Sequence, residues 1–347
     1  MVAYCVFALL PDHGAGDNNA RLYNRKYSLM PSGNEIFDAD ENARRVTTLV
    51  LEEKAVAFVG SGLSAGVYPS WPDLIKKLCV RCDVMPEYSI DANTTPGLLQ
   101  DLAGQAEASS PKEYEEVLLE VFAAPMDVKR DEDPQRFREV EKAYDTLMAA
   151  PFKSLVTVNF DPLLAEHRHR PGNDDYELVK FPLLEALKLE GKSICYVHGY
   201  IAPASTGTGE LVLTKTSFYN AYDKHKSMLP TFFEVMLREC QIVFIGCGLR
   251  DHEIGVCLEE HKRFITDSTF DLAFGSHFML LPARSKDGNR LEEVETRECA
   301  EFERLGITIV RYDKRNRCHT GLVEVLNSWC PTATLNVCKN PSEDYEP

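Results

Sequence analysis

The chain has 347 residues, of which 44% are hydrophobic and 27% charged, and its formal net charge is −16. That length suits one large α/β domain with insertions, or two domains of ordinary size. So acidic a surface repels nucleic acid and anionic membranes, and we expect neither as a partner. A dinucleotide is not excluded, because backbone N–H groups can bind its phosphates.

The 11 cysteines are scattered along the chain. We expect reduced thiols and a cytoplasmic location, because disulfides are rare inside cells. Cys79 and Cys82 form a single C-x-x-C pair, whereas a structural zinc site normally needs two such pairs. We therefore predict that they pack on a helix face and that no metal binds. No stretch approaches the roughly 18 apolar residues that span a bilayer.

Residues 1–42 are predicted to be an N-terminal extension, since much of this segment is rich in Gly, Asn, Asp and Ser. A helix is predicted over Ala43–Glu53, and a short buried strand over Ala55–Val59. A glycine-rich turn, Gly60–Gly66, follows that strand, and helical spacing resumes over Trp71–Cys82. The chain thus opens with a strand, a turn and a helix.

Residues 83–150 are predicted to be an inserted helical subdomain. Apolar residues recur at intervals of three and four over Leu98–Glu107 and Tyr114–Phe122, and Pro134 is placed to begin another helix. Because this block contains no predicted strand, it interrupts the alternation of strands and helices.

Alternation resumes after residue 150, and it implies a Rossmann-like, doubly wound parallel sheet covered by helices on both faces. We predict the main domain over 43–330 and a polar tail over 331–347. The remaining predicted strands are Ser154–Val158, Ser193–Val197, Ile242–Ile245, Phe278–Leu281 and Ile307–Tyr312, and the remaining predicted helices are Leu229–Cys240, Arg290–Leu305 and Gly321–Ser328.

Four predicted strands end in glycine or polar residues. These ends read G-S-G-L-S from Gly60, V-N-F-D through Asn159 and Asp161, H-G at His198, and G-C-G-L-R-D from Gly246. In doubly wound sheets, ligands bind outside the carboxyl ends of the strands. We therefore expect these four segments to meet at one site.

Taken singly, each motif leaves two interpretations open. The turn Gly60–Gly66 matches G-x-G-x-x-A, which either approaches a pyrophosphate closely or only reverses the chain. Asp161, which precedes Pro162, either caps a helix or touches a ligand. Asn159 lies farther from that helix and is the better ligand candidate.

His198 ends a predicted strand, a position that favours catalysis, although an isolated histidine is more often structural. Its imidazole titrates near neutral pH and suits general base catalysis. Asp251 follows the second glycine turn, and it either bonds a ribose hydroxyl or caps the next helix.

The ordered set G-S-G-L-S, T-V-N-F-D, H-G and G-C-G-L-R-D resembles the NAD-binding motifs of the sirtuin family. More specifically, the chain is similar to the sirtuin-like NAD hydrolases of bacterial anti-phage defence systems. Ser70-Trp71 after the first turn and Leu213-Thr214 farther along support this resemblance, which covers roughly residues 45–330.

The resemblance implies a role for each matching position. His198 is the expected base, and Asn159 and Asp161 are expected to hold the nicotinamide ribose and the attacking water. The expected NAD-binding residues are Gly60, Ser61, Gly62, Ser64, Asp73, Thr157, Gly246, Cys247, Gly248 and Asp251. Relatives of this kind are typically oligomers under the control of partner proteins, so a homo-oligomer and a regulatory partner are expected as well.

The chain departs from sirtuin deacylases in two respects. It has no zinc ribbon, and Trp71-Pro72-Asp73-Leu74 stands where those enzymes have P-D-F-R. Both departures weaken the case for acyl-lysine as nucleophile and favour water. The sequence therefore predicts hydrolysis of NAD to nicotinamide and ADP-ribose. A protein deacylase or ADP-ribosyltransferase, and a sensor of NAD or ADP-ribose without turnover, are the alternatives.

Overall fold

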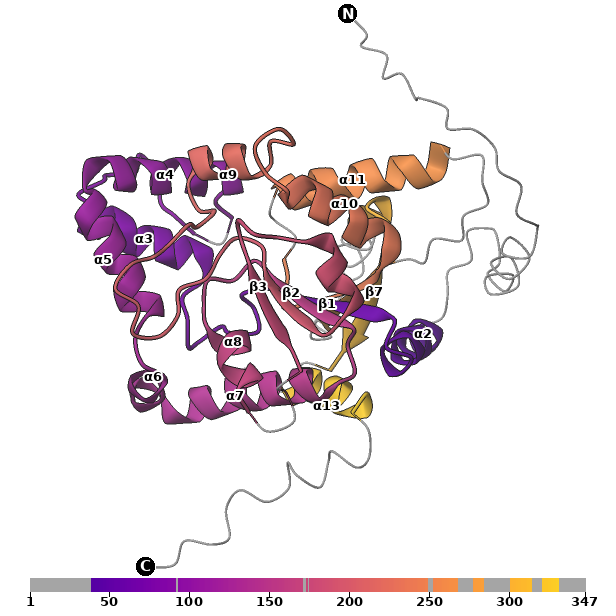
Figure 1. Cartoon of the computed structure of the whole chain (residues 1–347). Helices are drawn as coiled ribbons and strands as arrows, with labels where there is room; N and C mark the ends of the chain where they lie inside the picture. Colours follow the sequence, from indigo (N-terminus) through magenta and orange to yellow (C-terminus); the bar gives the residue numbers. More distant parts are fainter. Residues whose placement is uncertain are drawn as a thin grey trace, which may run out of the picture.

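The computed structural model describes residues 39–91, 93–170, 173, 175–248, 252–267, 277–283, 300–313 and 320–330. At its centre these residues form a seven-stranded sheet in which every strand pair is parallel (Figure 1). The strands are β1 (Ala55–Val59), β2 (Ser154–Thr157), β3 (Glu177–Lys180), β4 (Ser193–Tyr196), β5 (Gln241–Ile245), β6 (His277–Pro282) and β7 (Ile307–Tyr312).

The strand order is β3-β4-β2-β1-β5-β6-β7. The chain builds outward from β1 through β2 and β4, then returns to the other side of β1 with β5. Such a reversal between neighbouring strands is the topological switch point at which doubly wound sheets bind ligands. The predicted Rossmann-like parallel sheet is confirmed, and the crevice lies between the carboxyl ends of β1 and β5.

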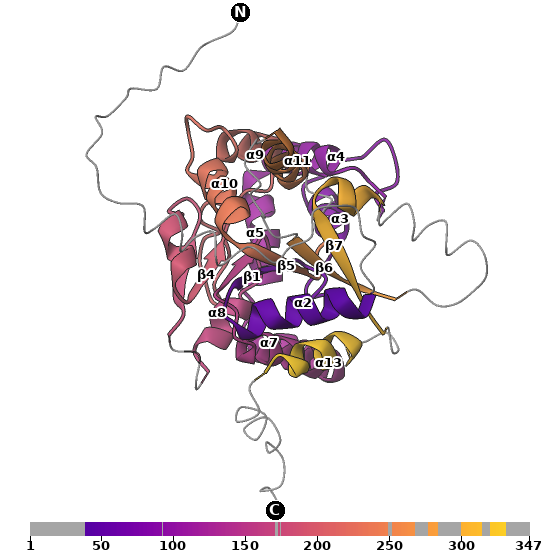
Figure 2. The same cartoon turned by 90° about the vertical axis from the view of Figure 1, so that its right-hand side faces the viewer.

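Helices cover both faces of this sheet, as Figure 2 shows. Along β1, Ala57 and Val59 face a core shared with the helices on one side, while Val56 and Phe58 face a second core on the other. This alternation is the side-chain period of a strand. On the first face lie α2 (Ala39–Leu51), α7 (Pro134–Ala149), α8 (Leu163–Arg168) and α13 (Thr320–Ser328), and on the second lie η1 (Ala186–Glu190), α10 (Leu229–Glu239) and α11 (His252–Asp267).

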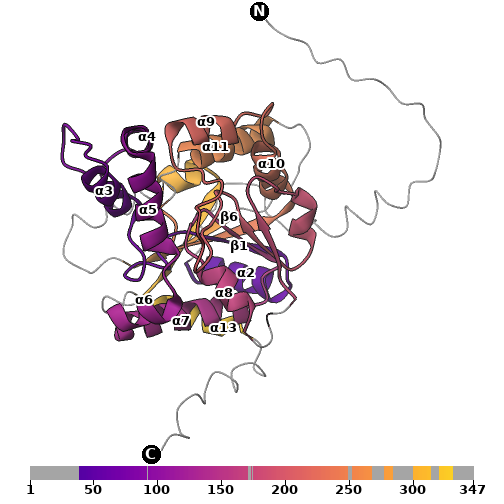
Figure 3. The ribbon, with the colours of Figure 1, turned by 60° about the vertical axis from the view of Figure 1, so that its left-hand side comes forward.

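Every element described between β1 and β2 is a helix, as predicted. Ser70 caps the first of them, because its side chain accepts a hydrogen bond from the Asp73 backbone N–H, and Asp133 caps α7 in the same way. Figure 3 shows α3, α4 and α5 packed side by side beyond the sheet. The four helices that precede α7 are α3 (Trp71–Arg81), α4 (Pro96–Ser109), α5 (Pro111–Phe122) and α6 (Met126–Glu132).

The structure adds elements that the sequence pattern did not predict. The strand β3 has only one buried residue, Val179, because it lies at the sheet edge, so it lacks the apolar run that marks the inner strands. The helix α9 (Lys215–Ala221) is a short helix set by a capping box between Thr214 and Ser217. The helix α6 and the 3₁₀ turn η1 were likewise not predicted, and α11 was expected only as a helix after Asp251, without bounds.

Some predictions fall partly or wholly outside the described residues. Helix α2 begins at Ala39, four residues before the predicted start, and residues 1–38 are not described. Of the helix predicted over Arg290–Leu305, the structure describes only residues from 300 onward, and 331–347 are not described at all. The predicted boundaries of the extension, the helical block and the tail stay predictions.

The buried indole of Trp329 ties the end of α13 to α2. Its Nε1 donates a hydrogen bond to the Thr47 hydroxyl at 2.9 Å, and its ring meets Phe152 edge-on at 5.9 Å. Phe152 lies just before β2, so this contact closes the core at the amino ends of the strands.

Cys79 and Cys82 are buried free thiols in and just after α3. Across the described ranges, no three or more His, Cys, Asp or Glu side chains come together as a metal would require. In the same part of the chain, no helix is both long and apolar enough to span a bilayer.

Candidate functional site

The two glycine turns meet at the switch point. Gly60 N–H donates to the Ile245 carbonyl and Gly62 N–H to the Gly246 carbonyl, each at 2.9 Å. A Cβ atom on Gly62 would lie 2.6 Å from the Gly246 oxygen, and Gly246 itself has a φ of +66°. Both glycines are thus explained by the close approach of two backbones. The turns form the floor of the crevice.

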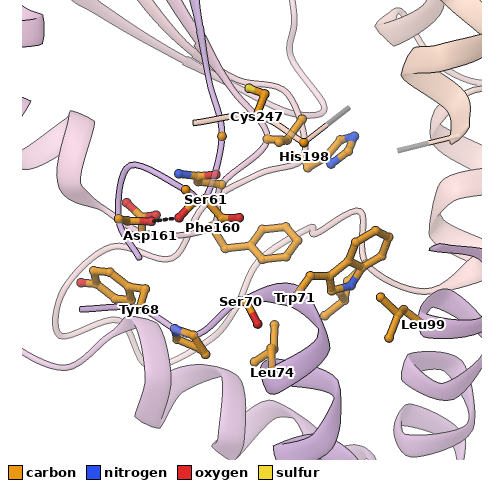
Figure 4. Close-up of a pocket in the computed structure, with 18 of the residues that line it drawn as sticks. Ser61, Tyr68, Ser70, Trp71, Leu74, Leu99, Phe160, Asp161, His198 and Cys247 are labelled. Carbon is orange, nitrogen blue, oxygen red and sulfur yellow. Dashed lines mark hydrogen bonds between the residues drawn. The ribbon is translucent and has the colours of Figure 1, made fainter. Parts of the chain in front are cut away.

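A cavity of about 490 Å³ opens above these turns, a volume within the usual range of small-molecule sites (Figure 4). We call its strand-end side the sheet wall, formed by Gly60, Ser61, Gly62, Ser64, Asn159, Phe160, Asp161, His198, Gly246, Cys247 and Gly248. We call the opposite side the helix wall, formed by Trp71, Leu74, Pro96, Leu99, Phe218 and Ile254.

Asn159 lies in the sheet wall two residues after β2. Its backbone N–H donates to the Thr157 hydroxyl at 3.0 Å, and that hydroxyl donates to the Val59 carbonyl at 2.8 Å. The side chain is almost fully buried, yet neither its amide oxygen nor its amide nitrogen has a hydrogen-bond partner among the described residues. Because buried polar groups are nearly always paired, this amide marks a place where a ligand or water binds.

The N-cap position of α8, which begins at Leu163, is Pro162 and not Asp161. Asp161 still contacts the start of that helix, because its Oδ1 accepts a hydrogen bond from the Leu163 N–H at 3.2 Å. The same residue lines the cavity. Burial raises the pKa of its carboxyl to about 6, while the Ser64 hydroxyl and the Leu163 N–H lower that pKa part of the way. The carboxyl therefore titrates near neutral pH.

His198 follows β4 by two residues and reaches the same cavity. Its Nε2 lies 2.9 Å from the Tyr222 hydroxyl, and its ring packs edge-on against Phe218 at 5.1 Å. Burial lowers the pKa of the imidazole to about 3, so the ring is neutral at physiological pH. Gly199, with a φ of +82°, turns the chain directly after it.

Cys247 and Gly248 line the cavity beyond β5. The Cys247 thiol donates a hydrogen bond to the Phe58 carbonyl at 3.2 Å, and burial raises its pKa to about 12. The thiol is therefore protonated and a weak nucleophile. Asp251, expected near the adenosine half of the ligand, lies outside the described residues.

The structure does not bring Thr157 and Asp73 into the cavity wall. Thr157 is fully buried behind the wall, where its hydroxyl is engaged by the backbone. Asp73 lies on the first turn of α3, where its carboxylate accepts from the Ser70 hydroxyl at 2.6 Å and pairs with Lys76. That hydroxyl bond is the largest cause that lowers the pKa of Asp73.

The helix wall was not predicted as part of the site. The ring of Trp71 stacks on Phe218 at 6.1 Å, and its indole Nε1 is buried without a partner in the described part of the chain. In Figure 4, Trp71 and Leu99 lie at the opposite end of the cavity from Asp161. The spacing of these apolar residues indicated buried helix faces, but spacing alone cannot tell a cavity lining from a core.

Comparison with known proteins agrees with this architecture. Residues 153–308 match the family described as SIR2-like domain. The chain is also 23% identical over 260 residues to defense-associated sirtuin 2 of Bacillus subtilis. That alignment covers 73% of this chain and 23% of the relative, so the chain spans about a quarter of the relative's length. The match is therefore a distant homology to one part of a longer protein.

Proposed function

The chain carries a SIR2-like domain with a distant defence-associated homologue, and from this premise we propose that it hydrolyses the nicotinamide–ribose bond of NAD. The observation that carries the proposal is the placement of Asn159 and His198 in one wall of one cavity, above the two glycine turns. The family match supports the use of NAD, and the choice of water as nucleophile rests on the residues that line the site.

The glycine turns suit the phosphate-bearing part of the substrate. Gly60, Gly62 and Gly246 carry no side chains where the two turns meet, so backbone can approach a pyrophosphate directly there. Such recognition needs no cationic side chain and agrees with the acidic composition of the chain.

In the proposed reaction, the oxygen of water attacks the C1′ carbon of the nicotinamide ribose. The C1′–N bond breaks, and its electron pair leaves with nicotinamide, which departs as a neutral molecule. The transition state resembles an oxocarbenium ion, so the protein mainly has to hold the ribose and position the nucleophile. The products are nicotinamide, ADP-ribose and one proton.

In this proposal, His198 accepts the proton that the attacking water or a ribose hydroxyl loses. Asn159 positions that water or hydroxyl. A buried neutral imidazole is ready to accept a proton, and the negative phosphates of the bound substrate would stabilise the imidazolium. The Asp161 carboxylate, on the same wall, would stabilise developing positive charge on the sugar when it is ionised.

An unrestrained NAD hydrolase would consume the NAD of the cell that makes it, so we propose that the protein also has an inactive state. Binding of a second copy of the chain or of a regulatory partner would convert this inactive state to the active one, in keeping with the defence role in the relative's name. The assay therefore measures nicotinamide release from NAD at several protein concentrations, with and without the products of neighbouring genes.

In the active condition, Asn159→Ala and His198→Ala are each expected to lower turnover by about 10²–10⁴-fold. His225→Ala, which changes an exposed histidine away from the cavity, serves as the control and is expected to keep full activity. Normal turnover in both folded site variants would refute the assignment. Nicotinamide release only in the presence of an acylated peptide would identify a deacylase, and binding of NAD without products would identify a sensor.

A further inference from the structure

The hydroxyl of Tyr222 contacts the candidate base from outside the cavity. Tyr222 directly follows α9, and its oxygen lies 2.9 Å from the Nε2 atom of His198. His198 lines the cavity, whereas Tyr222 is not among the residues that form its walls. An imidazole can accept a proton at either of two nitrogen atoms, and this contact occupies one of them. The tyrosine therefore bears on which nitrogen can act as the base.

Aromatic packing fixes the position of the Tyr222 hydroxyl. The tyrosine ring stacks on Phe218 and on Phe233, at 6.0 and 5.9 Å between ring centres and with interplanar angles of 7° and 19°. Phe218 also meets the His198 ring edge-on at 5.1 Å. Both phenylalanines are buried. The hydroxyl is thus held beside Nε2 by packing, and little conformational freedom remains to be lost when the two groups bond.

His198 can have its single ring proton on either nitrogen. Burial lowers the pKa of the imidazole far below neutral pH, so the ring is neutral. Its hydrogen bonds decide which nitrogen is protonated, and within the described part of the chain the ring bonds Tyr222 alone. If Nε2 donates to the tyrosine oxygen, Nδ1 keeps a lone pair. If the tyrosine donates to Nε2, Nδ1 carries the proton and no lone pair is left for a substrate.

We propose that Tyr222 is a positioning residue that makes Nδ1 of His198 the base, an inference that rests on the proposed function. The Nε2–H group donates to the tyrosine oxygen before and after the reaction, and Nδ1 takes the proton that water or a ribose hydroxyl loses. The imidazolium that forms keeps its bond to Tyr222, and a hydrogen bond to the charged form of a group favours that form.

Tyr222→Phe tests this role, because it removes the hydroxyl and keeps the stacked ring. Turnover at saturating NAD is expected to fall about 10- to 100-fold, the effect of losing a hydrogen bond to a charged group. ADP-ribose is expected to bind within about twofold of wild type, since an interaction used only in the reaction does not contribute to ground-state affinity. Tyr219→Phe is the matched control, because Tyr219 is an exposed tyrosine of the same helix, and it is expected to keep full turnover.

Nitrogen NMR of the full chain, carrying isotope-labelled histidine, measures the protonated position directly. The signals of His198 are those that disappear in His198→Gln. Wild type is expected to have a protonated Nε2 and an unprotonated Nδ1 near neutral pH. In Tyr222→Phe the Nε2 proton signal is expected to move upfield, because its hydrogen bond is lost. This measurement on wild type does not depend on the folding of a variant.

The outcomes separate this inference from the proposed function. A wild-type protein that releases no nicotinamide in the active condition, or a His198→Ala variant with normal turnover, would end both. If those two proteins behave as proposed and Tyr222→Phe keeps full turnover, the positioning role is overturned while the proposed function stands. A wild-type ring protonated at Nδ1, or an equal loss of turnover and ADP-ribose affinity in Tyr222→Phe, would overturn it as well.

Discussion

The two walls of the cavity are built on different physical grounds. The sheet wall is set by topology, because parallel strands end at one edge and bring their following residues together. The helix wall is set by packing, because α3 packs against α4 and α4 against α9, while Gln100 of α4 donates a hydrogen bond to Glu253 of α11. The first wall carries the polar side chains of Asn159, Asp161 and His198, and the second is formed mostly by apolar side chains. The comparison teaches that the candidate catalytic residues and the residues that close the cavity lie in different parts of the chain. The first follow strands, and the second lie mostly on helices.

Acidification is expected to have the largest effect, and to act through the sheet wall. His198 has a pKa of about 3 when folded, against 6.5 for an ordinary histidine. The unfolded chain therefore binds the proton more readily, and stability is lost as pH falls below 6.5. At about 1.4 kcal/mol for each pKa difference of one, the loss reaches roughly 3 kcal/mol by pH 4.

This prediction is checked by urea unfolding of wild type and His198→Gln between pH 4 and 7. The variant is expected to lack this part of the pH dependence. Asp161 acts in the opposite direction, since its raised pKa costs stability as pH rises from 3.8 towards 6, so only the difference between the two proteins isolates the histidine. Identical pH profiles would mean that His198 is not a buried neutral base.

The next largest effect is expected at the glycine contact. Gly62→Ala places a Cβ 2.6 Å from the Gly246 oxygen, and we expect a loss of about 2–4 kcal/mol in the free energy of unfolding, together with loss of NAD binding. Gly97→Ala is the matched control on α4, where an added Cβ meets nothing within 4 Å. It is expected to stabilise the protein by up to about 1 kcal/mol. Chemical denaturation measures both, and equal effects would contradict the close approach of the turns.

On the helix wall the expected effects are on affinity rather than chemistry. Trp71→Ala removes a large ring that lines the cavity, and we expect ADP-ribose to bind about tenfold more weakly, equivalent to about 1.4 kcal/mol. Turnover at saturating NAD is expected to fall far less than in His198→Ala. Trp329→Phe, away from the cavity, is the control. A large fall in turnover with unchanged affinity would show that this wall takes part in the chemistry.

The smallest effect is expected on the outer surface of the helical block. Arg81 on α3 pairs with Glu113 and Glu120 of α5, each at 3.0 Å, and is 41% exposed as a side chain. Exposed ion pairs contribute little, so Arg81→Ala is expected to leave the free energy of unfolding nearly unchanged and NAD turnover unchanged. Urea unfolding at low and high salt measures this contribution. A larger loss would indicate that the helices enclosing the cavity depend on charge rather than apolar packing.

Local sequence signals predicted the sheet wall well. The strands over Ala55–Val59 and Ile307–Tyr312 have the predicted bounds, and Asn159, Asp161 and His198 line one cavity as their positions after strands suggested. The edge strand β3 was not predicted, because a strand with one buried residue lacks the apolar run of an inner strand.

The helix wall could not be predicted from the sequence. The spacing of Leu74 and Leu99 predicts only that these side chains are buried, and the same spacing would serve a solid core. Whether helices leave a cavity depends on how they pack against one another, which is a property of the folded chain.

The tryptophans give the protein two built-in fluorophores, since the chain contains only Trp71 and Trp329. One indole borders the cavity at the carboxyl ends of the strands, and the other is buried at their amino ends with its N–H bonded to Thr47. Emission from Trp329→Phe would therefore come from the cavity alone. A nucleotide that stacked on Trp71 would quench it, so ligand entry can be followed in real time without any label.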